Sequence, residues 1–312
     1  MIETNGLPTT YRDPDLPESV TIYEVGPRDG LQNESATVPL ETKVGFVERL
    51  GAAGLPIVEA TSFVHPRWVP QLADAADLVA RLDLGGARPY PVLVPNERGL
   101  DRALEAGVTH VAVFASATET FAARNLNSTY DAQFAMFEPV VTRAREAGVQ
   151  VRAYLSMCFG DPWEGAVAPQ RVVEAGARLL AMGAYELSLG DTIGVGTAQH
   201  TRVLIDAFGE AGIGTDRLAM HFHDTYGQAL ANAYAALRRG ITTFDASAGG
   251  LGGCPYARSA TGNLATEDLV WMLDGLGISH GVDLEALAAT SAWMAGELGR
   301  PSPSAVVRAL TS

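Results

Sequence analysis

Short apolar runs alternate with longer amphipathic stretches through most of this chain. The runs are bounded by glycine, proline or polar residues, whereas the stretches between them repeat apolar residues at helical spacing, as in Val172, Ala175 and Leu179. This alternation is typical of a parallel sheet whose strands are joined by crossover helices. The expected strands cover residues 20–25, 56–60, 89–94, 109–114, 149–155, 184–189, 217–222 and 242–246.

Eight strands in this rhythm predict an α/β chain folded as a (β/α)8 TIM barrel, because eight is the number at which such a barrel closes. A doubly wound open sheet is the alternative fold. Against it, no Gly-x-Gly-x-x-Gly follows the first strand. Ala-Gly pairs also recur just before strands, where glycine suits the left-handed end of a helix; they occupy 53–54, 106–107, 147–148 and 211–212.

No change in composition divides the chain, and 312 residues suit one barrel with extensions. Residues 1–18 are polar and contain several prolines, so we expect a short N-terminal arm on the surface. The barrel domain is expected to span residues 19–300. It includes one extra C-terminal helix, at about 284–298, that lies outside the eight units, and a C-terminal tail follows at 301–312.

Composition excludes several classes of protein. The net charge of −14 argues against a nucleic-acid partner, which requires a clustered basic surface. Two cysteines cannot form a disulfide framework, and they indicate a reducing compartment. No apolar run is long enough to cross a bilayer, and no basic, apolar leader is present. We therefore expect no membrane partner and a cytoplasmic location.

Lysine is almost absent, since the 22 basic residues include one lysine, Lys43. An enzyme that cleaves carbon–carbon bonds through a Schiff base needs a desolvated lysine at a strand end. Lys43 instead falls in a helical pattern well past the first strand. Carbon–carbon chemistry in this chain would therefore need a metal ion rather than a covalent imine.

Polar residues gather where the expected strands end, which is where barrels place their active sites. The first strand ends at residues 26–27, and Arg28, Asp29 and Gln32 follow at once. Taken alone, the Arg-Asp pair could simply stabilise a strand-to-helix turn. Glu59, an acid at the end of the second strand, is either a salt-bridge partner of Arg28 or a participant in catalysis.

The seventh strand ends in a His-x-His pattern. His221 and His223 are two residues apart, so strand alternation directs both side chains to the same face, where both can reach one ion. Asp224 follows directly. It is expected to orient an imidazole, to cap the next helix, or to do both.

A glycine-rich segment follows the eighth strand, with four glycines among residues 249–253. It is not a phosphate-binding loop, because no Lys-Ser/Thr follows it. It places Cys254 in an exposed loop, where the thiol is either reactive or a spectator. Beyond it, Asn263 can offer an amide oxygen to a cation, and Thr266 with its trailing acids predicts a helix N-cap.

These stretches resemble the hydroxymethylglutaryl-CoA lyase family. The segment from Glu24 to Glu34 matches the family signature nearly letter for letter, and the segments at 220–232, 249–257 and 261–268 are also very similar. The wider superfamily of acyl-CoA-condensing synthases shares only residues 28–30 and Gln32. The resemblance implies a lyase that cleaves 3-hydroxy-3-methylglutaryl-CoA to acetyl-CoA and acetoacetate, a step of leucine degradation, with Mg²⁺ or Mn²⁺.

The resemblance also implies a role for individual residues. The metal ligands would be Asp29, His221, His223 and Asn263, and the catalytic residues Arg28, Asp29, Glu59, His221 and Cys254. Substrate contacts are implied at Gln32, Ser62, Ser188 and Asp191, with acyl-CoA contacts at 114–117 and 124–127. Strand alternation adds Arg152, which is expected to face the same site.

The expected reaction is a metal-assisted retro-Claisen cleavage. The ion would stabilise the alkoxide formed from the C3 hydroxyl, and Asp29, His221 or Glu59 would relay the proton. Arg28 would stabilise the negative charge that develops on the thioester oxygen. Cys254 would protonate the acetyl-CoA carbanion.

One departure from the family leaves alternatives open. Many members have cysteine and tyrosine where this chain has Asp161 and Trp163, in a segment expected near the substrate's acyl tail. A longer 3-alkyl-3-hydroxyglutaryl-CoA is therefore an alternative substrate. A condensing synthase is a second alternative, although such enzymes usually carry a C-terminal regulatory region. A metal-binding scaffold is the third, and Arg28, Glu59 and Cys254 argue against it because holding a cation does not require them.

The expected partner is an acyl-CoA thioester. A homodimer is the assembly considered, although the sequence does not fix the oligomeric state.

Overall fold

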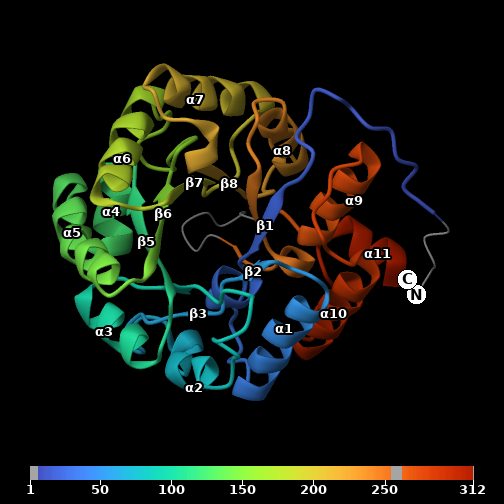
Figure 1. Cartoon of the computed structure of the whole chain (residues 1–312), viewed down its shortest axis with the longest axis horizontal. Coiled ribbons are helices and arrows are strands. Elements are labelled where there is room, and N and C mark those ends of the chain that lie inside the picture. The colour runs from blue at the N-terminus through green and yellow to red at the C-terminus, as the bar shows by residue number, and fades with distance from the viewer. Residues whose placement is uncertain (1–5, 254–261, 312) are drawn as a thin grey trace.

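The computed structural model describes residues 6–253 and 262–311. Within them, nine parallel strands form one sheet that curls into a barrel (Figure 1). The strands are β1 (Thr21–Glu24), β2 (Ile57–Val58), β3 (Thr61–Ser62), β4 (Val92–Leu93), β5 (His110–Ser116), β6 (Gln150–Ser156), β7 (Glu186–Asp191), β8 (Leu218–Phe222) and β9 (Thr243–Ala246). Their order in the sheet is β2-β1-β9-β8-β7-β6-β5-β4-β3.

The two end strands of this order, β2 and β3, are halves of one expected strand. They are separated only by Glu59 and Ala60. The Glu59 amide donates to the Glu24 carbonyl at 2.8 Å, and the Ala60 amide donates to the Pro91 carbonyl at 2.9 Å. Since β2 pairs with β1 and β3 pairs with β4, the ring closes across this break. The TIM-barrel prediction is confirmed, with the strand expected at 56–60 divided in two.

Helices cover the outside of the ring (Figure 1). They are α1 (Leu40–Ala52), α2 (Ala75–Val79), α3 (Glu97–Glu105), α4 (Glu119–Leu126), α5 (Tyr130–Glu146), α6 (Pro169–Met182), α7 (Ala198–Glu210), α8 (Ala229–Leu237), α9 (Thr266–Leu276), α10 (Leu284–Glu297) and α11 (Ala305–Thr311). Short helical turns form η1 (Gly26–Gly30), η2 (Pro70–Leu72), η3 (Thr215–Arg217) and η4 (Ala248–Gly250). The four glycines expected to end helices all have positive φ, between 76° and 92°.

The segments outside the barrel pack on its C-terminal helices. In the arm, the Tyr11 amide donates to the Gly275 carbonyl at 2.9 Å, and Arg12 Nη1 donates to the Gly277 carbonyl at 2.8 Å. The extra helix expected at 284–298 is α10. The expected tail contains α11, and Ser304 Oγ, just ahead of it, donates to Asp268 Oδ1 at 2.6 Å. Arm and tail are therefore both held near α9.

The apolar core lies between the strand ring and the helices. Strand residues such as Val111, Val151 and Leu187 are buried against helix residues such as Val140 and Leu179. Inside the ring, by contrast, several buried side chains are charged, including Glu59, Arg152 and Asp245. The fold therefore concentrates buried polar groups along the barrel axis.

Lys43 does not face the barrel interior. It is buried on α1, where its Nζ lies 2.9 Å from Asp74 Oδ1 and also contacts the Gln71 carbonyl. The side chain ties α1 to the segment that contains η2. A Schiff-base role for this lysine therefore has no support in the geometry.

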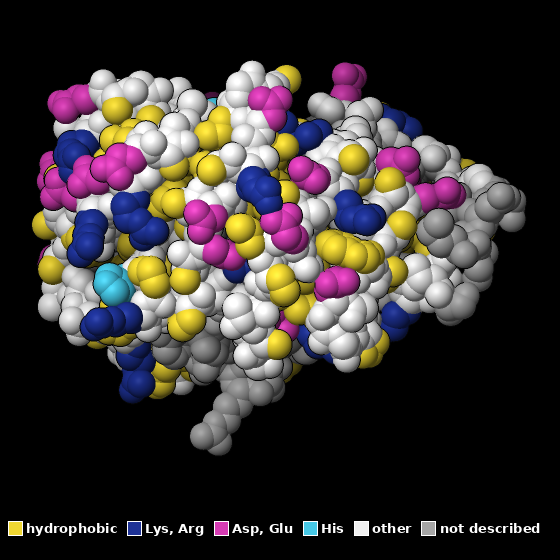
Figure 2. All heavy atoms as spheres, turned by 90° about the horizontal axis from the view of Figure 1, so that it is seen from below, with side chains coloured by type: hydrophobic (Ala, Val, Ile, Leu, Met, Phe, Trp, Pro, Cys, Tyr) yellow, Lys and Arg dark blue, Asp and Glu magenta, His cyan; other side chains and the backbone are white. Residues whose placement is uncertain are grey.

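The surface carries both signs of charge. On the face shown in Figure 2, Arg and Lys side chains are interspersed with Asp and Glu rather than gathered into one basic area. Among the helices of residues 6–253 and 262–311, none combines the length and the apolar character needed to cross a membrane.

Candidate metal centre and active site

A cavity of about 630 Å³ opens at the carboxyl end of the strand ring. Many of the described residues that line it lie at strand ends or just beyond them, as Ser62, Ser156 and Gly190 do, and others lie on α4 and α5. Polar lining residues include Arg28, Asp29, Gln32, Asn125, His221 and His223, and apolar ones include Leu93, Phe114, Phe121, Leu126 and Met136. The cavity thus combines a cluster of ionisable groups with an extensive apolar wall.

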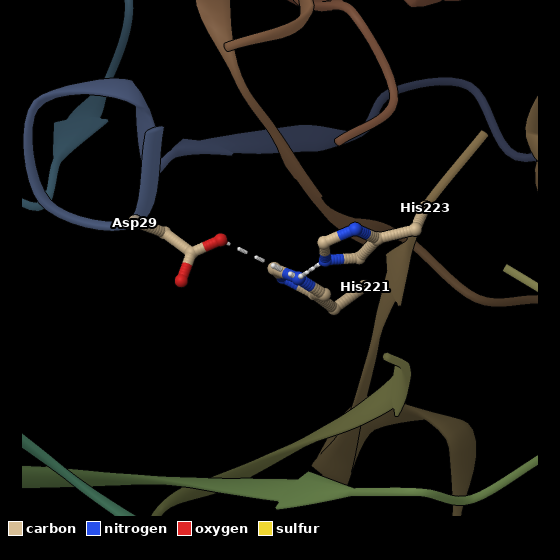
Figure 3. A group of neighbouring side chains, drawn as sticks. All are labelled: Asp29, His221 and His223. Atoms are coloured by element: carbon tan, nitrogen blue, oxygen red, sulfur yellow. Dashed lines mark hydrogen bonds and ion pairs between the residues drawn. The ribbon is translucent and has the colours of Figure 1, made fainter. Parts of the chain in front are cut away.

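Asp29, His221 and His223 meet at this cavity, as expected (Figure 3). Asp29 lies in η1, His221 near the end of β8, and His223 just beyond it. Asp29 Oδ2 is 4.0 Å from His221 Nε2, and the two imidazole Nε2 atoms are 3.3 Å apart. One potential ligand atom from each residue lies within 4.8 Å of the other two. The three groups can therefore share one cation.

Asn263 lies beside this cluster. It forms an isolated antiparallel bridge with His223, and its Nδ2 donates to Asp29 Oδ2 at 2.8 Å and to the Leu251 carbonyl at 3.0 Å. Its Oδ1 is buried and has no hydrogen-bond partner among the described residues. A buried amide oxygen without a partner is costly unless something binds it. The set of carboxylate, imidazole and amide donors fits a divalent cation.

Arg28 links the metal cluster to the acid of the second strand. Its Nη1 lies 2.6 Å from Asp29 Oδ1, and its Nη2 donates to Glu59 Oε2 at 3.2 Å. Burial raises the pKa of Glu59 above its usual value, although the Arg28 charge opposes this. Burial also acts to raise the pKa of Asp29, but Arg28 and the imidazoles outweigh it, and that pKa falls well below its usual range. Of the two roles considered for Glu59, the salt bridge with Arg28 is present, and it does not exclude the catalytic one.

Sequence reasoning missed the part played by Tyr154. Its hydroxyl donates to Glu59 Oε2, and its ring lies 5.2 Å from the Arg28 guanidinium carbon. The same ring meets His221 edge-on, with 6.2 Å between centroids. Tyr154 also lines the cavity. The available signal was its position in β6, two residues after Arg152, since both face the barrel interior.

Asp245 on β9 was also missed, and it orients His221. Asp245 Oδ2 lies 3.2 Å from His221 Nδ1 and accepts from Ser188 Oγ at 2.6 Å. Asp245 Oδ1 accepts from Arg152 Nη2 at 2.6 Å. Burial acts to raise the pKa of Asp245, but Arg152 and His221 together outweigh it and lower this pKa to about 2. The carboxylate therefore stays charged behind the imidazole.

The N-cap position of α8 is Gln228, so the start of this helix is contacted but not capped by Asp224, the residue expected to orient an imidazole, to cap the next helix or to do both. Asp224 Oδ1 accepts from the Ala229 amide at 2.9 Å, at the first turn of α8. Orientation of His221 comes from Asp245 instead. The expectation that Thr266 caps α9 is wrong, because the helix begins at Thr266 itself and its hydroxyl donates to Glu24 Oε2 at 2.6 Å.

The residues expected to contact substrate fall into two groups. Gln32 and Ser62 line the cavity. Arg152, Ser188 and Asp191 are not among the described lining residues. Arg152 and Ser188 support Asp245, whereas the two oxygens of Asp191 accept from the Val195 and Gly196 amides, each at 2.9 Å, in the loop after β7. Burial raises the pKa of Asp191 to about 6. The geometry thus favours a supporting role for these three.

The segment that leads to Cys254 is held by two buried acids. Glu24 Oε1 accepts from the Gly26 amide at 2.7 Å and from the Ala248 amide at 2.8 Å. Glu267 Oε2 accepts from the Gly249 amide at 2.9 Å. Gly253 lines the cavity, whereas Cys254 lies outside the described residues. The structure therefore does not test the expected role of Cys254 as a proton donor.

The acyl-CoA contacts expected at 114–117 and 124–127 are partly at the cavity. Phe114 and all four residues from 124 to 127 line it. Ser116 turns away, and its amide and carbonyl both bond the Gln133 side chain. The residues that depart from the family, Asp161 and Trp163, contact α4 and its N-terminal loop and are not among the described lining residues.

Comparison with known proteins identifies the same family. The HMGL-like family profile matches residues 19–294. The mitochondrial hydroxymethylglutaryl-CoA lyase of Arabidopsis thaliana is 50% identical over 296 residues, covering 95% of this chain and 63% of that protein. This chain therefore spans about two thirds of the length of that plant relative. A 3-hydroxy-3-isohexenylglutaryl-CoA/hydroxymethylglutaryl-CoA lyase of Pseudomonas aeruginosa is 48% identical, covering 95% of this chain and 98% of that one.

A solved structure extends the likeness to three dimensions. An HMG-CoA lyase from Acinetobacter baumannii, in complex with coenzyme A and 3-methylmalate, superposes with a TM-score of 0.89 at 33% identity, covering 96% of this chain and 97% of that one. Since the family profile and these relatives cover nearly the whole barrel, the chain belongs to the HMGL-like family.

Proposed function

We propose that this protein is a lyase that cleaves 3-hydroxy-3-methylglutaryl-CoA to acetyl-CoA and acetoacetate. The observation that carries the proposal is the meeting of Asp29, His221 and His223 beside Arg28 at one cavity. The names of the similar proteins support a CoA thioester as substrate. The donor set supports Mg²⁺ or Mn²⁺ as the ion, held by these three residues and Asn263.

The C3 hydroxyl must lose its proton before the bond between C2 and C3 can break. The cation, when bound, supplies positive charge that makes this proton easier to remove. The protein contributes three candidate acceptors, which are Asp29, His221 and Glu59. Asp245 holds His221 in one orientation, and Tyr154 and Arg28 hold Glu59. Arg28 and Asn263 hold Asp29, so each acceptor is fixed by its neighbours.

Arg28 is placed to stabilise the charge that moves onto the thioester oxygen. Its guanidinium is held by Asp29, by Glu59 and by the ring of Tyr154, so it needs little reorganisation as charge develops. The carbanion that remains on acetyl-CoA then takes a proton. Cys254, which directly follows the lining residue Gly253, is proposed as the donor of that proton.

The apolar wall favours one second candidate, a substrate with a longer 3-alkyl group. Leu93, Phe114, Phe121 and Met136 line the cavity, and one relative is named for both the methyl and the isohexenyl substrate. We propose the methyl compound as the main substrate because the plant and the Pseudomonas relatives are both named as hydroxymethylglutaryl-CoA lyases.

The remaining features of the proposal are not carried by the geometry of the site. They are a role in leucine degradation, a homodimeric assembly and a cytoplasmic location; the plant relative named above is mitochondrial.

The test is release of acetyl-CoA and of the matching 3-oxo acid, which is acetoacetate for the methyl compound, from a panel of 3-alkyl-3-hydroxyglutaryl-CoA thioesters assayed with Mg²⁺, with Mn²⁺ and after chelation. The expected result is cleavage of the methyl compound that disappears on chelation and returns with either ion. Faster turnover of a longer compound would instead select the second candidate. Absence of acetoacetate with both ions would contradict the proposal.

A further inference from the structure

The segment after β6 forms a tight turn at residues 161–165. The Asp161 amide donates to the Gly165 carbonyl at 2.9 Å, and the Gly165 amide returns a bond to the Asp161 carbonyl at 2.8 Å. Asp161 Oδ1 also accepts from the Trp163 amide at 2.7 Å and from the Glu164 amide at 2.9 Å. The Asp161 side chain is buried and forms the centre of the turn.

This turn is fastened to the N-terminus of α4. Thr118 Oγ1 donates to Asp161 Oδ2 at 2.6 Å, and Glu164 Oε1 accepts from the Thr120 amide at 2.6 Å. The second contact satisfies one of the amides left open at the start of a helix and adds a negative charge where the helix dipole favours it. These contacts therefore fix the position of the turn relative to α4.

The same turn also holds a cation on α4. The guanidinium carbon of Arg124 lies 4.5 Å from the centre of the Trp163 ring. Arg124 is exposed and lines the cavity, together with Phe121, Asn125 and Leu126 of the same helix. A guanidinium stacked on a ring keeps its N–H groups in its own plane, where they can still bind a planar or tetrahedral anion.

The charges around the cavity indicate which anion Arg124 would meet. Arg28 and Arg124 are the two arginines among the described lining residues, and Arg28 is paired with Asp29 and Glu59 at the metal cluster. Asp29 is the one carboxylate in that described lining. In a protein of net charge −14, a polyanionic ligand needs such a local cation.

We propose that Trp163 is a positioning residue that holds Arg124 where it binds the phosphate groups of the CoA moiety. The inference rests on the proposed acyl-CoA substrate and adds to it a site for its phosphates. It also gives a reason for the departure at Asp161 and Trp163: these residues set the position of α4 and Arg124 instead of bordering the substrate's acyl tail.

The test compares Trp163→Leu with Trp163→Phe, which keeps an aromatic face. Trp293→Leu is the matched control, because Trp293 carries a similar stack with Arg49, at 4.6 Å, and is not among the described residues that line the cavity. Each variant is assayed with 3-hydroxy-3-methylglutaryl-CoA and with the corresponding pantetheine thioester, which lacks the diphosphate and the 3′-phosphate. Binding of free CoA is measured by calorimetry, so that the test does not depend on cleavage.

Trp163→Leu is expected to raise KM for the CoA thioester, and Kd for CoA, about fivefold while leaving kcat and the pantetheine reaction unchanged. Trp163→Phe and Trp293→Leu should behave like the wild type. An unchanged Kd for CoA, or an equal rise in KM for both thioesters, would overturn the inference. Failure of the wild type to cleave either thioester would refute the proposed function instead, since CoA binding still tests the role of Trp163.

Discussion

At the scale of single residues, Arg28 is held on several sides through its guanidinium. It contacts carboxylates on both sides, Asp29 at 2.6 Å and Glu59 at 3.2 Å, and its guanidinium lies over the ring of Tyr154. Burial would otherwise disfavour its charge, but the two acids raise its pKa well above the usual value. A permanent cation is thus held in one orientation at the cavity wall, as a role in stabilising an oxyanion requires.

Replacement of Arg28 by Gln should therefore remove turnover without removing the ion. We expect kcat to fall by about 10²–10³, the usual loss when one oxyanion donor is removed. Mn²⁺ affinity, measured by calorimetry, should stay near the wild-type value because Arg28 is not a ligand. Near-normal turnover by Arg28→Gln would show that Arg28 does not stabilise the charge on the thioester oxygen.

Asp245 gives a second prediction at this scale. Asp245→Asn keeps the shape of the side chain but loses the charge that faces His221 and Arg152. Residues that orient metal-binding imidazoles typically contribute 10–100-fold to metal affinity, and we expect a loss of about that size for Mn²⁺. Ser188→Ala removes one bond to the same carboxylate but keeps its charge, so its loss should be smaller. Equal Mn²⁺ affinity in the wild type and in Asp245→Asn would show that the Asp245 carboxylate does not contribute to metal binding.

Individual residues could be predicted where strand alternation acts on a recognisable pattern. His221 and His223 are the clearest case, because a spacing of two on a strand places both side chains on one face. Asp245 carries no such pattern, because its role depends on β9 pairing beside β8. Tyr154 shares the alternation of Arg152 on β6, but its contacts with Glu59 and Arg28 reach strands that are not its neighbours in the ring. The place of Asp224 directly after His223 did not reveal its contact, because its side chain bonds the first amide of α8 rather than an imidazole.

At the scale of elements, the strands and helices follow the hydrophobic pattern, and the differences arise from contacts with segments that are distant in sequence. The second strand is broken at Glu59 and Ala60, whose amides bond to two different neighbouring strands. Such a break depends on partners that the local sequence does not reveal. The prediction that Thr266 is a helix N-cap was wrong for the same reason. The Thr266 hydroxyl donates to the Glu24 side chain at the end of β1 instead.

Glu267 makes a prediction about α9 and the glycine segment it supports. Burial raises its pKa from the usual 4.5 to about 8, although bonds from Ser291 and Gly249 oppose the shift. The folded protein therefore retains a proton that the unfolded chain has lost between these values. The free energy of unfolding should fall as pH rises from 4.5 toward 8.

Glu267→Gln should make that fall shallower, by about 2 kcal/mol between pH 5.5 and 7.5. Urea unfolding at the two pH values measures the difference. Glu285→Gln, an exposed position on α10, is the control and should follow the wild type. Identical pH dependence in wild type and Glu267→Gln would show that Glu267 is ionised in the folded protein at neutral pH.

At the scale of the whole molecule, ring closure is what assembles the site. Residues 29, 221, 223 and 263 come from opposite ends of the chain, and β1 lies beside β9, next to β8, only because the sheet closes on itself (Figure 1). The eight repeating units were predictable from the sequence because each repeats the same pattern, although one expected strand is divided in two. The packing of the arm and of α11 near α9 was not, since both depend on single polar contacts such as those of Arg12 and Ser304.

The most direct test of the central claim, one cation shared by these four side chains, is anomalous scattering from crystals grown with Mn²⁺. We expect a single strong peak within about 2.0–2.4 Å of an Asp29 oxygen, one nitrogen each of His221 and His223, and Asn263 Oδ1. A Mn²⁺ peak elsewhere in the cavity, or no peak at these residues while the enzyme is active, would contradict the account.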